Sequence, residues 1–510
     1  MSGVLRAKKG RQRKGPVAII DIGSNSVRLV VYEGSKRAPL PIYNEKLICG
    51  LGRNLESDGR MSEDSMDLAI HGLHRYVALT ESMDVLCVHT VATAAVREAS
   101  NGAAFVERIE RDCGLDVNVV SGSQEAELSG LGVLSAIPAA QGVMGDLGGG
   151  SIELVKLGSG GLRQKATLPL GVLRSSGINF TDTAIDRRLS NLGWLNLSKG
   201  ETFYAVGGAW RALARIHMEQ AHYPLHLIHQ YSINATEALS FVKFVRNLSR
   251  ATLEGTKGLS RQRIDSVPYA ARLLERLLLN SGADNLVFCS YGIREGCLFD
   301  RLSRGRRSED PLIAMCQEVD SRNGRGTSNG ESLANWIGPV FDNTVPQLAR
   351  LRLAASHLAD IGWSEHPDYR AEQVFLRILR MPLVGLDHFE RSILALSVAS
   401  RHSGIDGIVQ RWHVNRLLNE KGINKEDVVS FKPDREFEFI LNDQLLYCMK
   451  SKDIVIKHEN RGNEEIYNPS WARGGERVDK SCQGGNCGHG RGCVCGPTKE
   501  CSCNKEVSYI

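Results

Sequence analysis

The amino-acid sequence predicts an α/β protein followed by a mainly helical region, and three observations carry this prediction. Short apolar runs alternate with segments of helical period from residue 17 to about residue 302, which is typical of mixed sheets covered by helices. A ten-residue pattern that begins at Asp21 recurs 125 positions later at Asp146. From about residue 333 to residue 420 the apolar residues are spaced as in helices. Because 510 residues are too many for one core, several domains are expected.

The first unit begins with two strands that a turn connects. Residues 17–34 predict this pair, with the turn at Gly23-Ser24-Asn25. The sequence Ser121-x-x-Gln124 has the form of a capping box, which starts a helix and places Glu125 in its first turn. The second unit repeats the order strand, turn, strand around Asp146. Between the first strand pair and the capping box we expect a helix at 62–81, a strand at 85–91, a helix at 103–112 and a strand at 117–120.

The two ends of the chain and one internal segment depart from this pattern. Residues 1–15 hold six basic and no acidic side chains, and we expect a disordered arm. Because the net charge is +5, the remainder carries 5 − 6 = −1, which does not favour a nucleic-acid partner. Residues 303–332 predict a linker and residues 461–510 a disordered tail. The sequence has neither a secretory signal nor an apolar run of the ~20 residues that span a membrane, so we expect a cytoplasmic protein without a membrane partner.

The duplicated pattern contains residues suited to phosphate and a divalent cation. Asp21-Ile-Gly-Ser-Asn-Ser-Val-Arg28 aligns without a gap on Asp146-Leu-Gly-Gly-Gly-Ser-Ile-Glu153. A turn of small residues lets backbone N–H groups approach phosphate oxygens, and carboxylates are ligands of Mg²⁺. Either copy alone is also explained as a tight hairpin capped by its Asp, but the repetition favours a site. Because Arg28 stands where the second copy has Glu153, the second turn is the better metal candidate.

Five motifs occur in the order seen in a known family. They are Asp21-Ile-Gly-Ser-Asn-Ser26, Ala92-Thr-Ala-Ala-Val-Arg97 with Asn101, Ser121-Gly-Ser-Gln-Glu-Ala126, Asp146-Leu-Gly-Gly-Gly-Ser-Ile-Glu153 and Gly292-Ile-Arg-Glu-Gly296. From residue 16 to 302, and more weakly to about 460, the chain resembles the exopolyphosphatase / guanosine pentaphosphate phosphatase family, within the actin / sugar kinase / heat-shock-70 superfamily. The resemblance implies two actin-like (ribonuclease H-like) domains, 16–135 and 136–302, that flank a cleft. A mainly helical, degenerate HD-like domain at 333–460 would follow.

The resemblance also implies roles for individual residues. Glu125 is the catalytic residue that orients or deprotonates the attacking water, although family members usually have a second acid where this chain has Gln124. Without the resemblance, Glu125 would merely complement the helix dipole, and Arg97 would form a surface ion pair with Glu98 or Asp112. The implied phosphate-binding residues are Ser24, Asn25, Arg97, Gly148, Gly149, Gly150 and Ser151, and the implied Mg²⁺ ligands are Asp146, Glu153 and Asp21.

Two further regions have alternative interpretations. Gly207-Gly208 follows an apolar strand where superfamily members bind adenosine, but we favour a plain strand-to-helix turn because a polyphosphate needs no base pocket. In the HD-like region His357-Leu-Ala-Asp360 replaces the His-Asp doublet of an active HD site, so we expect no second metal site there. Five arginines of this region could line a polyanion track or be solvated: Arg370, Arg377, Arg380, Arg391 and Arg401.

The C-terminal tail is rich in cysteine and lies outside the family pattern. Two Cys-x-Cys pairs and His489 in a Gly-rich context resemble a metallothionein-like segment, which predicts a Zn²⁺ or Cu⁺ cluster. Disulfides are the alternative, which a cytoplasmic location disfavours. The candidate ligands between residues 482 and 503 are Cys482, Cys487, Cys493, Cys495, Cys501 and Cys503.

The function that these residues and the resemblance predict is a Mg²⁺-dependent exopolyphosphatase that removes terminal orthophosphate from inorganic polyphosphate. One alternative is guanosine pentaphosphate 5′-phosphohydrolase, an activity of the stringent response that uses the same catalytic parts. A second alternative is a non-catalytic sensor of nucleotide or polyphosphate. The family resemblance also suggests a homodimer.

Overall fold

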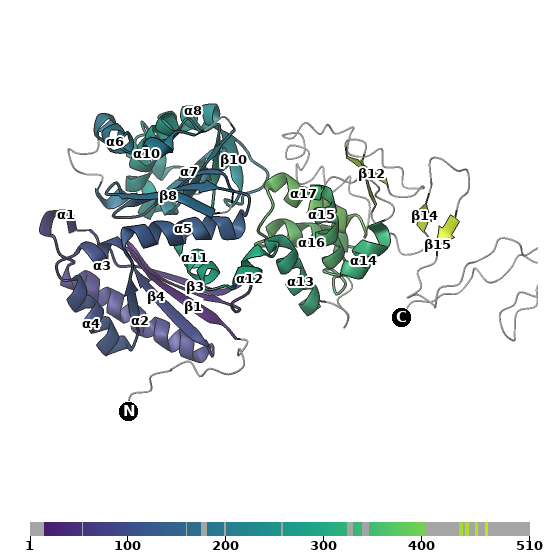
Figure 1. Cartoon of the computed structure of the whole chain (residues 1–510), viewed down its shortest axis with the longest axis horizontal. Helices are drawn as coiled ribbons and strands as arrows, with labels where there is room; N and C mark the ends of the chain where they lie inside the picture. The colour runs from purple at the N-terminus through teal and green to yellow at the C-terminus, as the bar shows by residue number, and fades with distance from the viewer. Residues whose placement is uncertain are drawn as a thin grey trace, which may run out of the picture.

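The computed structural model describes residues 15–402 apart from 54, 160, 175–180, 198–199, 257–258, 324–329 and 339–345, together with four short strands between residues 438 and 467. Two α/β domains and a group of helices follow one another along the chain (Figure 1). Among the described residues, none of the helices combines the length and the apolar composition of a membrane span. The six candidate tail ligands from Cys482 to Cys503 and the arm at 1–14 lie outside the described residues.

The first domain is built on a five-stranded sheet with the order β3-β2-β1-β4-β5. Strand β1 pairs antiparallel with β2 and parallel with β4, and Asp21 lies opposite Arg28 in the hairpin. The strands are β1 (Val17–Ile22), β2 (Ser26–Tyr32), β3 (Pro41–Ile48), β4 (Cys87–Ala92) and β5 (Val117–Val119). The helices are α1 (Leu55–Asp58), α2 (Glu63–Ser82), α3 (Ala94–Glu98) and α4 (Gly102–Cys113).

The second domain repeats the core of the first. Its six-stranded sheet has the order β10-β11-β9-β6-β7-β8, so β8-β7-β6-β9 corresponds to β3-β2-β1-β4, and Asp146 lies opposite Glu153 as Asp21 lies opposite Arg28. The strands are β6 (Gly142–Leu147), β7 (Ile152–Gly158), β8 (Gly161–Leu168), β9 (Thr202–Val206), β10 (Tyr231–Asn234) and β11 (Asn285–Phe288). The helices are α6 (Asp182–Leu189), α7 (Gly208–Gln220), α8 (Ala235–Val245), α9 (Arg250–Glu254) and α10 (Val267–Ser281), with short 3-10 helices η1 (Val172–Arg174), η3 (Gly193–Leu195) and η4 (Arg261–Ser266).

Two crossed helices lie between the sheets of the two domains (Figure 1). They are α5 (Gly122–Ala136), which packs on β7 and β8, and α11 (Ile293–Asp300), which packs on the first sheet. The helices approach closely because two glycines face the partner backbone. A Cβ on Gly132 would lie 2.1 Å from the carbonyl oxygen of Gly292, and one on Gly296 would lie 1.8 Å from that of Leu128.

The C-terminal part is helical, as expected, but the predicted linker at 303–332 is wrong. Two helices occupy most of it, and Leu312, Met315 and Cys316 of the second helix are buried in a core shared with the second domain. The glycines and arginines of this segment suggested a linker, yet the apolar residues between them have helical spacing. The helices are α12 (Arg304–Ser308), α13 (Pro311–Asn323), α14 (Gly330–Ile337), α15 (Pro346–His357), α16 (Arg370–Arg380) and α17 (His388–Ala399). The four short strands are β12 (Glu438–Leu441), β13 (Gln444–Tyr447), β14 (Ile454–Ile456) and β15 (Glu465–Tyr467).

Candidate active site

The two copies of the duplicated pattern fold into the same turn. In the first copy the N–H of Gly23 donates to the carbonyl oxygen of Ser26 over 3.1 Å, and in the second the N–H of Gly148 donates to that of Ser151 over 3.0 Å. These residues occupy equivalent positions of the repeat. The sequence similarity of the copies therefore extends to backbone hydrogen bonding.

The carbonyl oxygens of each turn accept hydrogen bonds from a neighbouring loop on one side of the turn. In the second turn the carbonyls of Gly148 and Gly149 accept from the N–H groups of Val172 and Leu173, and that of Gly150 accepts from Arg174 Nε. Because a trans peptide places its N–H opposite its C=O, the N–H groups of Gly149, Gly150 and Ser151 point away from segment 172–174. Successive N–H groups of this kind form an anion-binding concavity.

The first turn has the same arrangement. The carbonyls of Ser24 and Asn25 accept from the N–H groups of Gly52 and Gly50 at 2.7 and 3.1 Å. The N–H groups of Asn25 and Ser26 consequently point the opposite way. Both copies thus have backbone donors that are oriented by a neighbouring loop of their own domain.

The two turns lie against each other. A Cβ on Gly149 would come within 2.9 Å of Ser24 Cβ, and a Cβ on Gly150 would come within 3.2 Å of Ser24 Oγ. Ser24 is accordingly buried, with 5% of its surface exposed. Glycine is needed at position 149 because any side chain would push the two turns apart.

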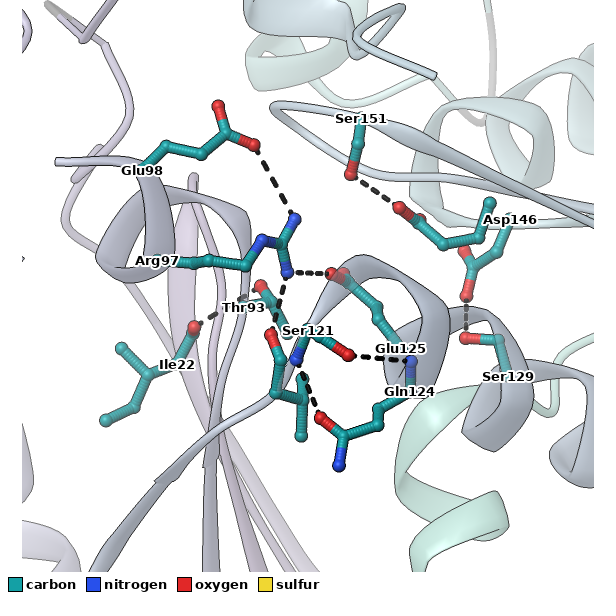
Figure 2. A network of polar contacts seen from close by, with 12 residues as sticks. Ile22, Thr93, Arg97, Glu98, Ser121, Gln124, Glu125, Ser129, Asp146 and Ser151 are labelled. Atoms are coloured by element: carbon teal, nitrogen blue, oxygen red, sulfur yellow. Dashed lines mark hydrogen bonds and ion pairs between the residues drawn. The ribbon is translucent and has the colours of Figure 1, made fainter. Parts of the chain in front are cut away.

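Glu125 lies beside Arg97, as Figure 2 shows. Ser121 and Gln124 form the predicted capping box, which starts helix α5 and fixes Glu125 in its first turn. Arg97 Nη1 donates to Glu125 Oε2 over 2.8 Å and to the carbonyl oxygen of Val120 over 2.9 Å. An ion pair with Glu98 or Asp112 was the alternative to a phosphate-binding role for Arg97. Glu98 lies 3.5 Å away, but the shorter contact with Glu125 was not predicted.

The carboxyl group of Glu125 is poised to exchange a proton near neutral pH. Only 8% of the residue is exposed, and burial raises its pKa to about 7 against the opposing effect of Arg97. Repulsion by Asp146 and Asp21 contributes to this raised pKa. A pKa near the working pH is what a general base requires.

Asp146 and Glu153 each accept a hydrogen bond from a serine. Ser129 Oγ donates to Asp146 Oδ2 over 2.7 Å, and Ser151 Oγ donates to Glu153 Oε1 over 2.6 Å. Burial raises the pKa of both carboxyl groups, and repulsion by Glu125 adds to the rise at Glu153. The role of Ser129 was missed, although it lies four residues after Glu125 and therefore on the same face of α5.

These carboxylates are oxygen donors that suit Mg²⁺. Their mutual repulsion in a buried site is the condition that a bound cation relieves. In the described part of the chain no group of three or more His, Cys, Asp or Glu side chains is already arranged to hold a metal ion. The carboxylate of Asp21 is instead paired with an arginine, since Arg294 Nη1 donates to its Oδ2 over 2.9 Å. Asp146 and Glu153 are therefore better placed as metal ligands than Asp21.

Two models of known protein families match this chain. The model of the Ppx/GppA phosphatase family matches residues 12–305, and that of the exopolyphosphatase C-terminal domain matches residues 312–422. The chain belongs to the Ppx/GppA phosphatase family. Exopolyphosphatase 1 of Mycobacterium leprae is 25% identical over 343 residues, which are 62% of this chain and 97% of that protein.

Solved structures confirm the actin-like fold of this Ppx/GppA family member. The Ppx/GppA protein of Aquifex aeolicus has 25% sequence identity and a TM-score of 0.50, with 57% of this chain and 99% of that chain covered. An exopolyphosphatase of Cytophaga hutchinsonii has 23% identity and a TM-score of 0.50, with 56% and 96% covered.

A group of cations in this Ppx/GppA family member was not predicted from the sequence. Arg28, Arg294 and Arg211 interact electrostatically, and burial together with Arg294 and Arg28 lowers the pKa of Arg211 to about 10. Burial and then Arg263, Arg28, Arg211 and Arg294 lower the pKa of Lys46 to about 8. We refer to these residues as the cationic group: Arg28, Lys46, Arg211, Arg263 and Arg294. Four of these side chains are partly buried and Lys46 is exposed, and such a concentration of positive charge beside the turns favours a polyanionic ligand.

The Gly207-Gly208 segment is a strand-to-helix turn between β9 and α7. Gly207 has a φ of +110°, and a Cβ on it would lie 2.5 Å from the carbonyl oxygen of Leu147. A Cβ on Gly208 would lie 2.3 Å from Arg263 Nη2, so this guanidinium group rests on the turn. The plain turn interpretation agrees with this geometry.

The histidine and arginine residues of the helical part have structural partners. His357 Nδ1 lies 2.9 Å from Asp320 Oδ2, whereas Asp360 pairs with Arg401, so His357 and Asp360 do not act together. Arg391 is 2% exposed and donates to the carbonyl oxygens of Met381 and Leu383. Arg391 therefore neither lines a polyanion track nor is solvated, so both alternatives are wrong for this residue.

Proposed function

We propose that this protein is an exopolyphosphatase that hydrolyses the terminal phosphoanhydride bond of inorganic polyphosphate. The observation that carries the proposal is the position of Glu125, which is buried, paired with Arg97 and adjacent to the facing turns. The relative in M. leprae has the same activity in its name, and the two family models together cover both parts of this chain.

Backbone N–H groups of the two turns and the side chain of Arg97 bind the terminal phosphate. The N–H groups of Gly149, Gly150 and Ser151, with those of Asn25 and Ser26, bind oxygens of the terminal phosphate. Arg97 binds the same group with its planar fork. Such donors stabilise the charge that spreads over the equatorial oxygens in the transition state.

Glu125 acts as the base that prepares the water. Its carboxylate accepts a proton from the water, whose oxygen forms a bond to the terminal phosphorus. The bond from that phosphorus to the bridging oxygen breaks, and this oxygen leaves with the electron pair on the shortened chain. Asp146 and Glu153 would hold Mg²⁺, which supplies positive charge to the phosphate oxygens.

The cationic group supports a long polyanion as substrate. Because a polyphosphate chain carries a negative charge at every phosphate, it matches a group of several cations better than a nucleoside does. Guanosine pentaphosphate remains the alternative substrate because its terminal phosphate requires the same catalytic parts. The homodimer and the cytoplasmic location stay predictions.

The test is a comparison of orthophosphate release from long-chain polyphosphate and from guanosine pentaphosphate, each with and without Mg²⁺. We expect Mg²⁺-dependent release, with a higher kcat/KM for polyphosphate. Faster release from the nucleotide would establish the alternative substrate. Absence of release from both, with binding retained, would establish the non-catalytic sensor.

A further inference from the structure

Glu98 lies between two arginines that belong to different domains. It is the last residue of α3 in the first domain, and its Oε1 is 3.5 Å from Arg97 Nη2 (Figure 2). Its Oε2 accepts a hydrogen bond from Nη2 of Arg174, at the end of η1 in the second domain. One carboxylate therefore bridges the two domains beside the phosphate-binding turn.

Each arginine is held in place by other contacts on its far side. Arg97 uses Nη1 to bind Glu125 and the carbonyl oxygen of Val120. Arg174 uses Nε to bind the carbonyl oxygen of Gly150 over 2.6 Å. The two guanidinium groups thus keep their positions without Glu98, and both direct their Nη2 edges toward the same place.

Glu98 is the exposed member of this arrangement. The side chains of Arg97 and Arg174 are 20% and 22% exposed, whereas that of Glu98 is 36% exposed. A flexible carboxylate in contact with water gains little from an ion pair and can turn outward at small cost. Carboxylate and phosphate oxygens accept from guanidinium groups in the same geometry, so one can replace the other.

We infer that Arg174 is a second phosphate-binding arginine and that Glu98 occupies the position of a substrate phosphate when no substrate is bound. This inference rests on the proposed function. Glu98 and Glu125 together balance the charges of Arg97 and Arg174, so displacement of Glu98 leaves one net positive charge for the incoming phosphate. A polyphosphate chain, which is held at further sites by the cationic group, displaces the carboxylate more readily than free orthophosphate does. Glu98 therefore weakens phosphate binding at this position, and a ligand that is also held at further sites stays bound whereas orthophosphate is released.

The test compares three variants and measures binding of orthophosphate and tripolyphosphate by calorimetry without Mg²⁺. Glu98→Gln is expected to lower the Kd of orthophosphate about 10-fold, and Arg174→Gln to raise it by a similar or larger factor, as for a hydrogen bond to a charged group. The Kd of Arg174→Lys for orthophosphate should fall between those of the wild type and Arg174→Gln, since lysine keeps the charge but lacks the planar fork. Arg250→Gln is the control because Arg250 is exposed and pairs with Glu254 on the surface.

The outcomes separate this inference from the proposed function, because orthophosphate binding is measured without turnover. Unchanged or weaker binding by Glu98→Gln, at an unfolding temperature equal to that of Arg250→Gln, would overturn the role of Glu98 even in an active enzyme. Unchanged binding by Arg174→Gln would overturn the role of Arg174. In an active enzyme, Glu98→Gln should also strengthen product inhibition by orthophosphate, an effect that a purely structural role would not produce.

Discussion

Arg97 Nη1 lies 2.8 Å from Glu125 Oε2, so the arginine expected to bind phosphate also holds the expected base. The two residues come from different elements, α3 and the first turn of α5. Their contact fixes the orientation of Glu125 before substrate binds. Burial favours the neutral form of the Glu125 carboxyl group, and the positive charge of Arg97 opposes this effect by stabilising the carboxylate.

Replacement of Arg97 should therefore affect both binding and catalysis. We expect Arg97→Gln to lower kcat/KM for polyphosphate about 100-fold, because a charge-assisted contact to phosphate and the support of Glu125 are both lost. Arg97→Lys should recover only part of this loss, since an ammonium group cannot serve Glu125, Val120 and phosphate in one plane. Steady-state kinetics measure the effect, and equal activity of wild type and Arg97→Gln would exclude the assigned role.

Asp146→Asn should weaken the use of Mg²⁺. The substitution keeps the shape and can keep a hydrogen bond with Ser129, but it removes the charge of a metal ligand. We expect the Mg²⁺ concentration for half-maximal activity to rise about 10-fold or more. Asp300→Asn, at the end of α11 and half-exposed, is the control. An unchanged Mg²⁺ requirement in Asp146→Asn would remove this residue from the metal site.

Gly149→Ala should separate the two turns. The added Cβ meets Ser24 Cβ at 2.9 Å, so we expect a loss of about 1–3 kcal/mol in the free energy of unfolding and a raised KM. Gly193→Ala is the matched control because a Cβ there meets nothing within 4 Å. The double variant Gly149→Ala with Ser24→Gly removes the nearest clashing atom and should regain part of the stability, since Leu173 Cδ1 still lies 3.1 Å from the added Cβ. Chemical denaturation measures it, and wild-type stability of Gly149→Ala would contradict the packing of the turns.

The buried His388 and the partly buried His229 make the stability depend on pH. Burial, reinforced by Arg391, lowers the pKa of His229 to about 3, and burial lowers that of His388 to about 4. Between these values and the usual 6.5 the unfolded chain binds more protons than the folded one, so stability is complete above pH 6.5 and falls as the pH decreases. Between pH 6.5 and pH 5 each histidine should lower the free energy of unfolding by about 2 kcal/mol.

The measurement is the free energy of unfolding of His388→Gln across this pH range. Its slope against pH should be smaller than that of the wild type. The exposed His74 provides the control, because His74→Gln should leave the slope unchanged. Equal slopes for wild type and His388→Gln would show that His388 does not stay neutral in the folded protein. His388, the first residue of α17, contacts the second domain, because its Nδ1 lies 3.0 Å from the Tyr223 hydroxyl. Unfolding breaks this contact.

Features encoded within a few residues could be predicted from the sequence. The capping box at Ser121 and Gln124 gave the start of α5 and the position of Glu125, because a cap requires only residues three apart. The repeat gave the two turns, since each forms within ten residues. The linker prediction for 303–332 is wrong because the segment is rich in glycine and arginine, although Leu312, Met315 and Cys316 have the spacing of a buried helix face.

The partners of the site residues could not be predicted in the same way. Arg97 and Glu125 are 28 positions apart, and Asp21 and Arg294 are 273 apart. Such pairs form only when two domains and the helices between them are assembled. Periodicity describes the faces of single elements and carries no information on which faces meet.

The central claim is that Glu125 activates water for attack on polyphosphate. The most direct test is orthophosphate release from polyphosphate with Mg²⁺ for wild type, Glu125→Gln and Glu127→Gln, the last an exposed residue of the same helix that pairs with Lys165. The account predicts that Glu125→Gln lowers kcat by about 10²- to 10⁴-fold at similar KM, while Glu127→Gln keeps wild-type rates. A wild-type kcat for Glu125→Gln would contradict it.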